Sequence, residues 1–169
     1  FDDACEVVNR LEALGVDVVE LSGGSYEAPA MQGQTRDDTT LAREAYFLEF
    51  AQALVSKTDI PLMTTGGIKR AEVAEEVIEQ GCALVGLASA LAITPDLAKK
   101  WQQEWAYSGI IPHCSWKDKS LASLANMAMV RRQLRRLGNN LTTLRNPSPL
   151  WSLILDMLHR KKMTKRDVG

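Results

Sequence analysis

The sequence has few cysteines, and they form no recognisable pattern. Cys5, Cys82 and Cys114 are the three in 169 residues, an odd number at wide intervals. This spacing argues against a disulfide framework and against paired metal ligands. We therefore expect no metal site, and a reducing compartment, the cytoplasm. Cys82 lies in an apolar run, which favours a small buried hydrophobic residue over a redox role.

The sequence also lacks a membrane-length apolar run and has almost no net charge. Hydrophobic residues make up 46% of the chain, enough for a core, but they come in short runs. The net charge of −1 hides an uneven division: residues 1–100 hold 8 Lys and Arg against 17 Asp and Glu, and residues 101–169 hold 12 against 4. We expect no membrane partner, a boundary near residue 100, and a basic C-terminal part.

The length suits one domain with an appendage. The first residue is Phe1 and a helical pattern begins at once, which is typical of a piece of a longer protein. We predict two parts: residues 1–106 form strand–helix units, and residues 107–169 form a basic helical extension.

Residues 60–89 predict a strand, a glycine turn, a helix and a second strand. Residues 60–65 and 82–87 are apolar runs, and residues 68–80 between them have helical spacing, ended by Gly81. This is a βαβ unit with two parallel strands. Strands that are apolar throughout are covered on both faces, as in α/β folds. Small residues just past a strand let backbone N–H groups approach an anion.

The same pattern occurs earlier in the chain. A helix over residues 4–14, ended by Gly15, precedes an apolar strand over residues 16–21. Gly81 and residues 82–87 repeat this order of glycine and strand. The repetition indicates stacked strand–helix units, and we predict three parallel strands with right-handed connections.

The segment between the first two strands is long for such a connection. Residues 25–40 are polar, and Tyr26 and Met31 are its best candidates for ligand contact. A helix is predicted over residues 41–57, and another opens at residues 94–96. The side chains predicted to face inward on the four N-terminal helices are Cys5, Val7, Val8, Leu11, Leu14, Tyr46, Phe47, Phe50, Ala53, Leu54, Val73, Ala74, Val77, Ile78, Leu97, Trp101 and Trp105.

The C-terminal part predicts two further helices. Ser120 is a candidate cap for a helix over residues 121–137, closed by Gly138. A short apolar helix follows over residues 150–158, and residues 160–169 predict a frayed basic tail. The inward face of the first of these helices is predicted from its apolar spacing: Leu121, Leu124, Ala125, Ala128, Leu134 and Leu137.

Basic side chains gather in this C-terminal part. Arg131, Arg132, Arg135 and Arg136 lie near a helix end, and residues 161–162 are both lysine. Nucleic-acid binding is one interpretation, but interleaved aromatic residues are missing. A solvated helix face, or a surface that docks the acidic N-terminal portion of the chain, is favoured, and we expect no nucleic-acid partner.

Motifs in residues 4–105 resemble, in order, the Old Yellow Enzyme family of FMN-dependent NADH:flavin oxidoreductases, which includes 2,4-dienoyl-CoA reductase-like enzymes. The segments that resemble its sixth strand, the next helix, the seventh strand and the eighth strand are residues 15–27, 43–51, 61–68 and 85–97. Three strands are too few for a closed barrel of eight. The resemblance implies an α/β fold: the C-terminal portion of a TIM (β/α)8 barrel, with about three parallel strands and a C-terminal helical extension.

The resemblance also implies where a cofactor would bind. In that family the FMN phosphate is held by backbone at the seventh-strand glycines and by a Gly-Arg pair after the eighth strand. The matching positions are Gly66, Gly67, Ala88 and Ser89, so Ala replaces Gly and Ser replaces Arg. Loss of the arginine removes a charge-assisted phosphate contact. The alternative is that Ala88 and Ser89 only form a tight strand-to-helix turn.

By resemblance, the parent protein passes a hydride from NAD(P)H to FMN and on to an electron-poor alkene, as an ene-reductase does. We expect this chain to contribute the phosphate end of the FMN site and no catalytic residue. His113 and His159 lie outside the barrel portion, and Glu20 is favoured as a structural residue. The alternative function is a non-catalytic interaction or dimerisation module. Unpaired strand edges predict that the chain self-associates.

Overall fold

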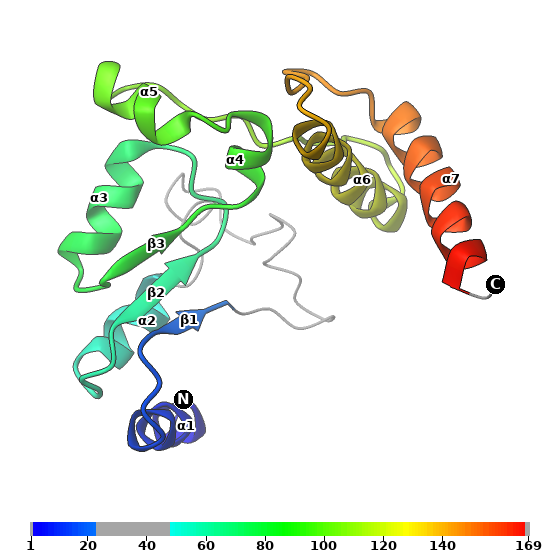
Figure 1. Ribbon diagram of the computed structural model, residues 1–169. Coiled ribbons are helices and arrows are strands. Elements are labelled where there is room, and N and C mark those ends of the chain that lie inside the picture. The colour runs from blue at the N-terminus through cyan, green and yellow to red at the C-terminus, as the bar shows by residue number, and fades with distance from the viewer. Residues whose placement is uncertain (1, 23–47, 168–169) are drawn as a thin grey trace. The chain divides into compact units, whose positions relative to one another are not determined.

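The computed structural model describes residues 2–22 and 48–167 of the chain. It divides the chain into two compact units: unit 1 comprises residues 1–88 and 98–108, and unit 2 comprises residues 89–97 and 109–169. Figure 1 shows a small sheet with helices in the first and a pair of long helices in the second. The proposed domains, residues 1–106 and 107–169, stay a prediction.

Unit 1 contains a three-stranded parallel sheet. Its strands are β1 (Val19–Leu21), β2 (Leu62–Thr65) and β3 (Leu84–Gly86), in the order β1-β2-β3. Val19 lies opposite Leu62, and Met63 lies opposite Leu84. The prediction of three parallel strands is confirmed, although each strand is shorter than its apolar run. The chain therefore has an α/β arrangement.

Three helices of unit 1 contribute to one core with the sheet. They are α1 (Asp2–Ala13), α2 (Leu48–Val55) and α3 (Ala71–Glu79). A further helix, α5 (Leu97–Gln103), follows residues 94–96 as predicted. The buried side chains of this core come from the three helices, the strands and the adjoining turns: Val8, Leu21, Leu48, Ala51, Leu54, Ile60, Leu62, Ile68, Val73, Val77 and Cys82.

The two faces of the sheet differ in burial. Leu62 and Thr64 point to one face of β2 and are 2% and 0% exposed. The alternate positions, which share the opposite face, are Glu20, Met63 and Leu84. Glu20 is exposed and Leu84 is 45% exposed. The helices therefore cover one face of the sheet, and the opposite face has a partly exposed apolar surface.

Two of the three predicted helix-ending glycines adopt left-handed backbone conformations, Gly15 with φ of 77° and Gly81 with φ of 97°. In each turn the glycine N–H and the next N–H bond back to the helix, which is the Schellman arrangement. The longer of these bonds run from Val16 N to Leu11 O (3.2 Å) and from Cys82 N to Val77 O (3.3 Å). The sequence repetition therefore corresponds to a repeated local structure.

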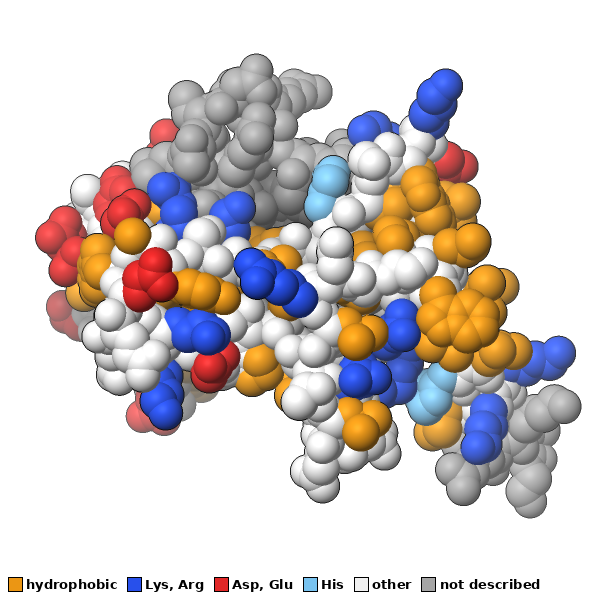
Figure 2. All heavy atoms as spheres, turned by 90° about the horizontal axis from the view of Figure 1, so that it is seen from above, with side chains coloured by type: hydrophobic (Ala, Val, Ile, Leu, Met, Phe, Trp, Pro, Cys, Tyr) orange, Lys and Arg blue, Asp and Glu red, His pale blue; other side chains and the backbone are white. Residues whose placement is uncertain are grey.

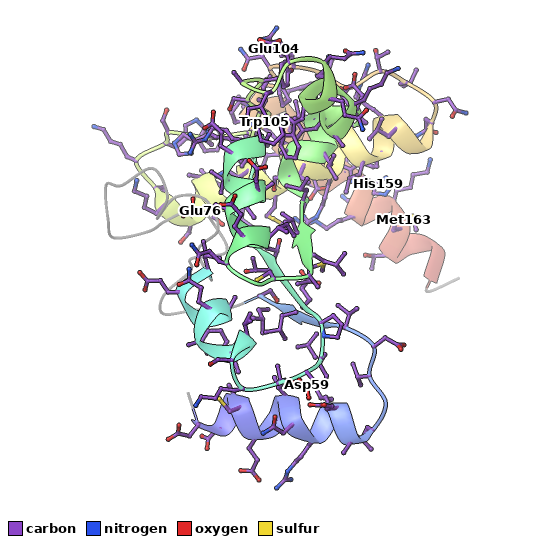
Figure 3. The ribbon with its side chains drawn as sticks, turned by 90° about the vertical axis from the view of Figure 1, so that its left-hand side faces the viewer. Asp59, Glu76, Glu104, Trp105, His159 and Met163 are labelled. Carbon is purple, nitrogen blue, oxygen red and sulfur yellow. The ribbon has the colours of Figure 1, made fainter. Side chains whose placement is uncertain are left out.

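Several predicted inward positions in unit 1 are wrong. Val7 is 56% exposed, Leu14 is 79% exposed and Ile78 is 47% exposed. Each lies at the margin of the apolar face of its helix, and only the residues at the centre of that face are buried. Trp105 follows α5 and is 50% exposed (Figure 3). In α2 the buried side chains are Leu48, Ala51 and Leu54, whereas the predicted Ala53 and Phe50 are exposed. Tyr46, Phe47 and the start of the predicted helix lie outside the described residues.

Unit 2 is helical. It contains α4 (Ser89–Ile93), α6 (Lys119–Gly138) and α7 (Pro149–Asp167). The sequence pattern missed α4, and it placed a frayed tail over residues 160–169 where α7 in fact continues. The helix keeps its backbone hydrogen bonds through the basic segment, so the run of Lys and Arg did not end it.

The ends of α6 differ from the prediction. Asp118, not Ser120, is the N-cap, and its side chain accepts a hydrogen bond of 2.9 Å from Leu121 N. Gly138 is still helical, and the chain turns at Asn140, whose φ is 56°. Asn tolerates the left-handed conformation better than most residues, so it takes the role predicted for glycine.

The buried face of α6 is also not the predicted one. Small and polar side chains are buried, whereas Leu121, Leu124 and Leu134 are 41%, 49% and 54% exposed. Of the predicted inward residues, Ala125 and Ala128 are fully buried. The buried residues of α6 are Ala122, Ala125, Ala128, Met129 and Gln133. The prediction that the leucines pack inward is therefore wrong.

Candidate functional site

Two of the four proposed phosphate-binding residues, Gly66 and Gly67, follow the carboxyl end of β2, which lies beside that of β3 at one edge of the sheet. Thr65, the last residue of β2, lies opposite Gly86, the last residue of β3. Gly66 and Gly67 continue from β2 with φ of 130° and 69°. These are conformations that L side chains rarely adopt, so glycine is required at this turn.

Close packing between the strand ends adds a further glycine to the site. The Thr65 hydroxyl donates a hydrogen bond of 3.2 Å to the Gly86 carbonyl oxygen. A Cβ atom at Gly86 would lie 2.9 Å from Thr65 Cβ. Gly86 therefore allows the two strand ends to approach each other, a role that sequence reasoning did not assign. A glycine inside an apolar strand often marks a close approach of another segment, so the position of Gly86 between Val85 and Leu87 could have indicated this role.

The remaining two proposed residues follow β3. Ala88 is exposed and ends the first segment of unit 1. Ser89 is half-buried, begins α4 and is the first residue of unit 2. Ser89 supplies a hydroxyl group, and Ala88 leaves its backbone uncovered by a large side chain. Binding of phosphate by Gly66, Gly67, Ala88 and Ser89 stays a prediction.

The chemistry available around this edge is mainly that of the backbone. Ile68, directly after the glycines, is 2% exposed and fixes the turn to the core. The Arg70 guanidinium lies 3.4 Å from a carboxylate oxygen of Glu72. Cys82 lies two residues before β3, at the opposite end of that strand, and burial raises the pKa of its thiol. A raised thiol pKa disfavours the reactive thiolate, which agrees with a packing role.

Other candidate residues lie elsewhere or outside the description. Tyr26 and Met31 are outside the described residues. His113 and His159 are both exposed in unit 2 (His159 is labelled in Figure 3). Across residues 2–22 and 48–167, no group of three His, Cys, Asp or Glu side chains could hold a metal ion. None of the helices in those ranges is both long and apolar enough to cross a membrane.

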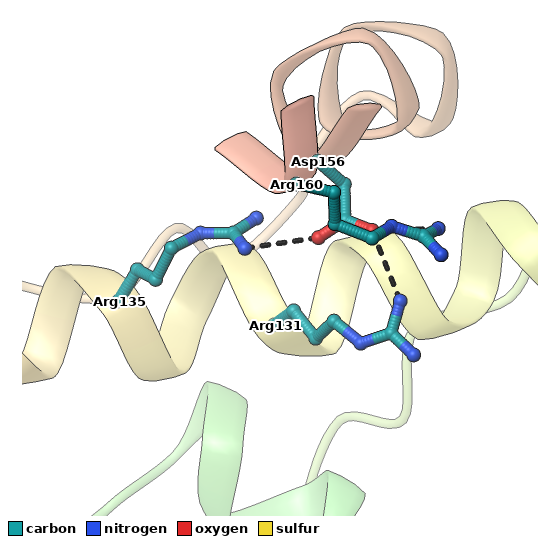
Figure 4. Close-up of polar contacts among 4 residues, drawn as sticks. All are labelled: Arg131, Arg135, Asp156 and Arg160. Carbon is teal, nitrogen blue, oxygen red and sulfur yellow. Dashed lines mark hydrogen bonds and ion pairs between the residues drawn. The ribbon is translucent and has the colours of Figure 1, made fainter. Parts of the chain in front are cut away.

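Unit 2 contains a charged cluster that sequence reasoning missed. Asp156 of α7 is 0% exposed and accepts hydrogen bonds of 2.9 Å from both Arg131 and Arg135 of α6 (Figure 4). Arg160, one turn further along α7, lies 3.1 Å from the same carboxylate. Asp156 is the one acidic residue between residues 119 and 166, and this isolated position among basic residues could have indicated the cluster from the sequence.

The electrostatic balance at Asp156 favours its charged form. Burial raises the pKa of its carboxyl group and is the largest single influence on it. The hydrogen bonds from Arg135 and Arg131 and the positive charges of these two arginines together lower that pKa by more. The pKa of Asp156 therefore lies below its ordinary value. Two arginines of the predicted basic face therefore meet an acidic residue of the same C-terminal part, and docking on the acidic N-terminal portion stays a prediction.

Further polar contacts surround this cluster. Arg132 donates to the hydroxyl group of Ser152, which in turn donates to the Ser148 carbonyl oxygen at 2.7 Å. Gln133 is 0% exposed, and its side-chain oxygen accepts a hydrogen bond of 2.7 Å from Leu144 N. The cluster and these contacts join α6, α7 and the segment between them, so we assign them a structural role.

The chain is similar in sequence to one kind of known protein. No family model matches the chain. Among curated proteins, the chain is similar at 31–38% identity to NADH-dependent flavin oxidoreductases and a related reductase, over about 57% of its length. This similarity confirms the resemblance that the ordered motifs indicated.

Particular relatives can be named. The chain is 36% identical over 103 residues to the NADH-dependent flavin oxidoreductase iliE of Hypocrea jecorina (strain QM6a), which covers 57% of this chain and 26% of that protein. It is 37% identical over 107 residues to iccE of Talaromyces variabilis, also an NADH-dependent flavin oxidoreductase (59% and 25%). It is 31% identical over 99 residues to the 4,4'-dithiodibutanoate disulfide reductase of Rhodococcus erythropolis (56% and 25%). The chain thus spans about a quarter of the length of these relatives.

Proposed function

We propose that this chain is part of an FMN-dependent NAD(P)H oxidoreductase of the ene-reductase type and contributes the phosphate-binding end of its FMN site. The observation that carries the proposal is the pair of left-handed glycines, Gly66 and Gly67, at the carboxyl end of β2. In parallel α/β folds this edge of the sheet is where ligands bind. The similarity to flavin oxidoreductases supports the choice of cofactor.

The residues present fit a phosphate group in their chemistry. Glycines without side chains leave backbone N–H groups accessible to an anion, and turns with successive exposed N–H groups bind phosphate in other folds. In the proposed site Gly66, Gly67 and Ala88 offer backbone donors, and Ser89 offers its hydroxyl group. The bound flavin would supply hydride transfer.

The proposal also accounts for the uncovered face of the sheet. In a TIM barrel the inner face of each strand packs against layers of side chains from the other strands. Met63 and Leu84, on the face opposite the helices, have the alternation expected of such an inner layer. We propose that further strands of a longer protein cover this face and complete the site, that the acceptor is an electron-poor alkene, and that the protein acts in the cytoplasm.

Titration with FMN and with riboflavin tests the phosphate site. The two differ in the phosphate group, so amide signals of Gly66, Gly67, Ala88 and Ser89 in nuclear magnetic resonance spectra should shift with millimolar FMN and not with riboflavin. Ser89→Arg should tighten FMN binding roughly tenfold or more, because it adds a charge-assisted, bidentate contact. The matched control is Ser123→Arg on α6, which should leave the affinity unchanged.

Two results would contradict the proposal. If FMN at millimolar concentration leaves these amides unshifted in both the wild type and Ser89→Arg, the site does not bind phosphate. If FMN and riboflavin shift the same amides equally, binding comes from the ring and the assignment of the glycines is wrong.

A further inference from the structure

The surface of α7 that faces away from α6 is apolar and then basic. Trp151 is 52% exposed and Leu158 is 60% exposed. Lys162, one turn further, is also exposed. These three residues are seven and four positions apart, so they share one side of the helix. Figure 2 shows hydrophobic side chains reaching the surface close to Lys and Arg.

The exposed surface of α1 carries the complementary pattern. Val7 is 56% exposed, and Leu14, just past the helix end, is 79% exposed. The Leu14 N–H still donates to Arg10 O at 3.2 Å, so the helical path extends to this residue. Asp3 is exposed and precedes Val7 by four positions, and Leu14 follows Val7 by seven.

The intervals on the two helices match when the helices run antiparallel. Asp3, Val7 and Leu14 on α1 then lie opposite Lys162, Leu158 and Trp151 on α7. One opposite-charge pair and two apolar pairs form along a single seam. Arg10, which also lies on this side of α1, is paired with Glu6, so it adds no excess positive charge.

Charge complementarity extends to the units as wholes. Unit 2 holds 12 Lys and Arg against 4 Asp and Glu, and unit 1 holds 8 against 17. A contact between two copies of unit 2 would bring like charges together, whereas unit 2 of one copy attracts unit 1 of another. We therefore propose that α7 of one copy docks on α1 of a second copy, through the seam of Trp151, Leu158 and Lys162 against Leu14, Val7 and Asp3.

Sedimentation of the 169-residue chain at tens of micromolar tests this contact. The wild type should associate, and more weakly at about 500 mM than at about 50 mM salt, because surface charges are screened. The α7 variant (Trp151→Gln with Leu158→Gln) and the α1 variant (Val7→Gln with Leu14→Gln) should each associate at least about tenfold more weakly. All four side chains are exposed, and circular dichroism would verify that each variant folds.

A mixture of the two variants is the decisive sample. The α1 variant keeps an intact α7, and the α7 variant keeps an intact α1. These two intact helices can bind each other, so an equal mixture should associate more strongly than either variant by itself. The matched control, Leu124→Gln with Leu134→Gln on the exposed side of α6, should associate as the wild type does. Lys162→Glu should weaken association, and Asp3→Lys in the same chain should restore it.

Four outcomes would overturn the proposal. The wild type could be monomeric at both salt concentrations. The α7 variant could associate as strongly as the wild type, as expected if open strand edges cause association. The mixed variants could stay apart, which would exclude the α1–α7 seam. The wild type could be monomeric and sediment only with vesicles of anionic phospholipid, which would assign the α7 surface to a membrane.

Discussion

At the scale of single residues, Asp156 forms the buried charged contact between the two long helices of unit 2. Its carboxylate is buried, and two arginines of α6 and one of α7 contact it. A buried carboxylate without such partners would be neutral at pH 7, because desolvation disfavours charge. The hydrogen bonds and positive charges of Arg135 and Arg131 together offset this desolvation, so the pKa of Asp156 is lowered.

Asp156→Asn should lower the free energy of unfolding by about 2–3 kcal/mol at pH 7, since it leaves Arg131 and Arg135 facing each other without a charge between them. The arginines are partly exposed, which limits the loss. Because the folded-state pKa is lowered, the wild-type carboxylate stabilises the fold above its unfolded-state pKa, about 3.9, and this stabilisation disappears as the pH falls through the folded-state pKa. Urea unfolding at pH 7 and below pH 4 measures both effects. An equal difference between variant and wild type at the two pH values would contradict this prediction.

Thr64, unlike Asp156, is a buried residue whose polar group has no partner among the described residues. Its side chain is 0% exposed, and within the described part of the chain its hydroxyl group has no hydrogen-bond partner. Thr64→Val keeps the shape and removes the unsatisfied group, so it should raise the free energy of unfolding by about 1 kcal/mol. Thr65→Val is the matched control, because the Thr65 hydroxyl does have a partner, the Gly86 carbonyl. A loss of stability in Thr64→Val would show that its hydroxyl is satisfied in solution.

At the scale of secondary-structure elements, the helix ends set where the strands begin. Gly15 and Gly81 both end a helix in the left-handed conformation, but their surroundings differ. A Cβ atom at Gly81 would lie 2.8 Å from Val55 Cγ1, whereas a Cβ atom at Gly15 would meet nothing within 4 Å. Gly81 therefore serves both the turn and the packing of α3 beside α2.

Comparing Gly15→Ala with Gly81→Ala separates these two roles. Gly15→Ala should cost about 1–2 kcal/mol, from the backbone conformation alone. Gly81→Ala should cost about 1–3 kcal/mol more, because Val55 must also move. Thermal unfolding of both variants measures the difference, and equal costs would mean that Val55 adjusts freely.

The difference between the predicted and observed burial of α6 can be tested by comparing two residues of this helix. Met129 is 2% exposed, and Met129→Ala should cost about 2–5 kcal/mol through the cavity it leaves. Leu134 is 54% exposed, so Leu134→Ala should change stability by less than about 0.5 kcal/mol. Urea unfolding distinguishes them. A large loss in Leu134→Ala would mean that α6 buries its leucines in solution, as the sequence pattern predicted.

At the scale of the whole molecule, the chain matches only about a quarter of the length of its relatives. A flavin ring needs a large apolar surface against it, and most binding energy comes from burying that ring. Hydride transfer further requires nicotinamide and acceptor to stack on the ring in a fixed geometry. By resemblance, the residues that serve these needs belong to earlier strands of the parent.

The 169-residue chain should therefore not catalyse NADH oxidation. With added FMN and an electron-poor alkene, the rate of NADH loss should equal that of free FMN alone, as followed by absorbance. Heat-unfolded chain at the same concentration is the control. A rate well above free FMN, or flavin fluorescence quenching that saturates at low micromolar FMN, would show that the chain builds its own ring site.

The sequence by itself determined the local structures whose cause is local. Apolar runs that end at glycines predicted three parallel strands and their helices, because strand periodicity and left-handed turns depend on a few neighbouring residues. The ordered motifs also indicated the relation to flavin oxidoreductases and marked Gly66 and Gly67. Helix limits were less accurate where the ending was polar, as at Asn140, because several residue types can serve there.

Only the tertiary structure decided which face of α6 is buried. Ala125 and Ala128 of the predicted inward face are buried, but Leu121, Leu124 and Leu134 are exposed, and the polar Gln133 is buried. The buried carboxylate of Asp156 requires Arg131 and Arg135 beside it, because a buried charge without a partner is costly. That pairing joins residues 21–25 positions apart, so no local pattern contains it. Ala122, Ala125 and Met129 are likewise buried against Cys114, in a segment that precedes the helix. Contacts with distant segments thus decide which side chains of α6 are buried, and helical spacing alone does not contain them.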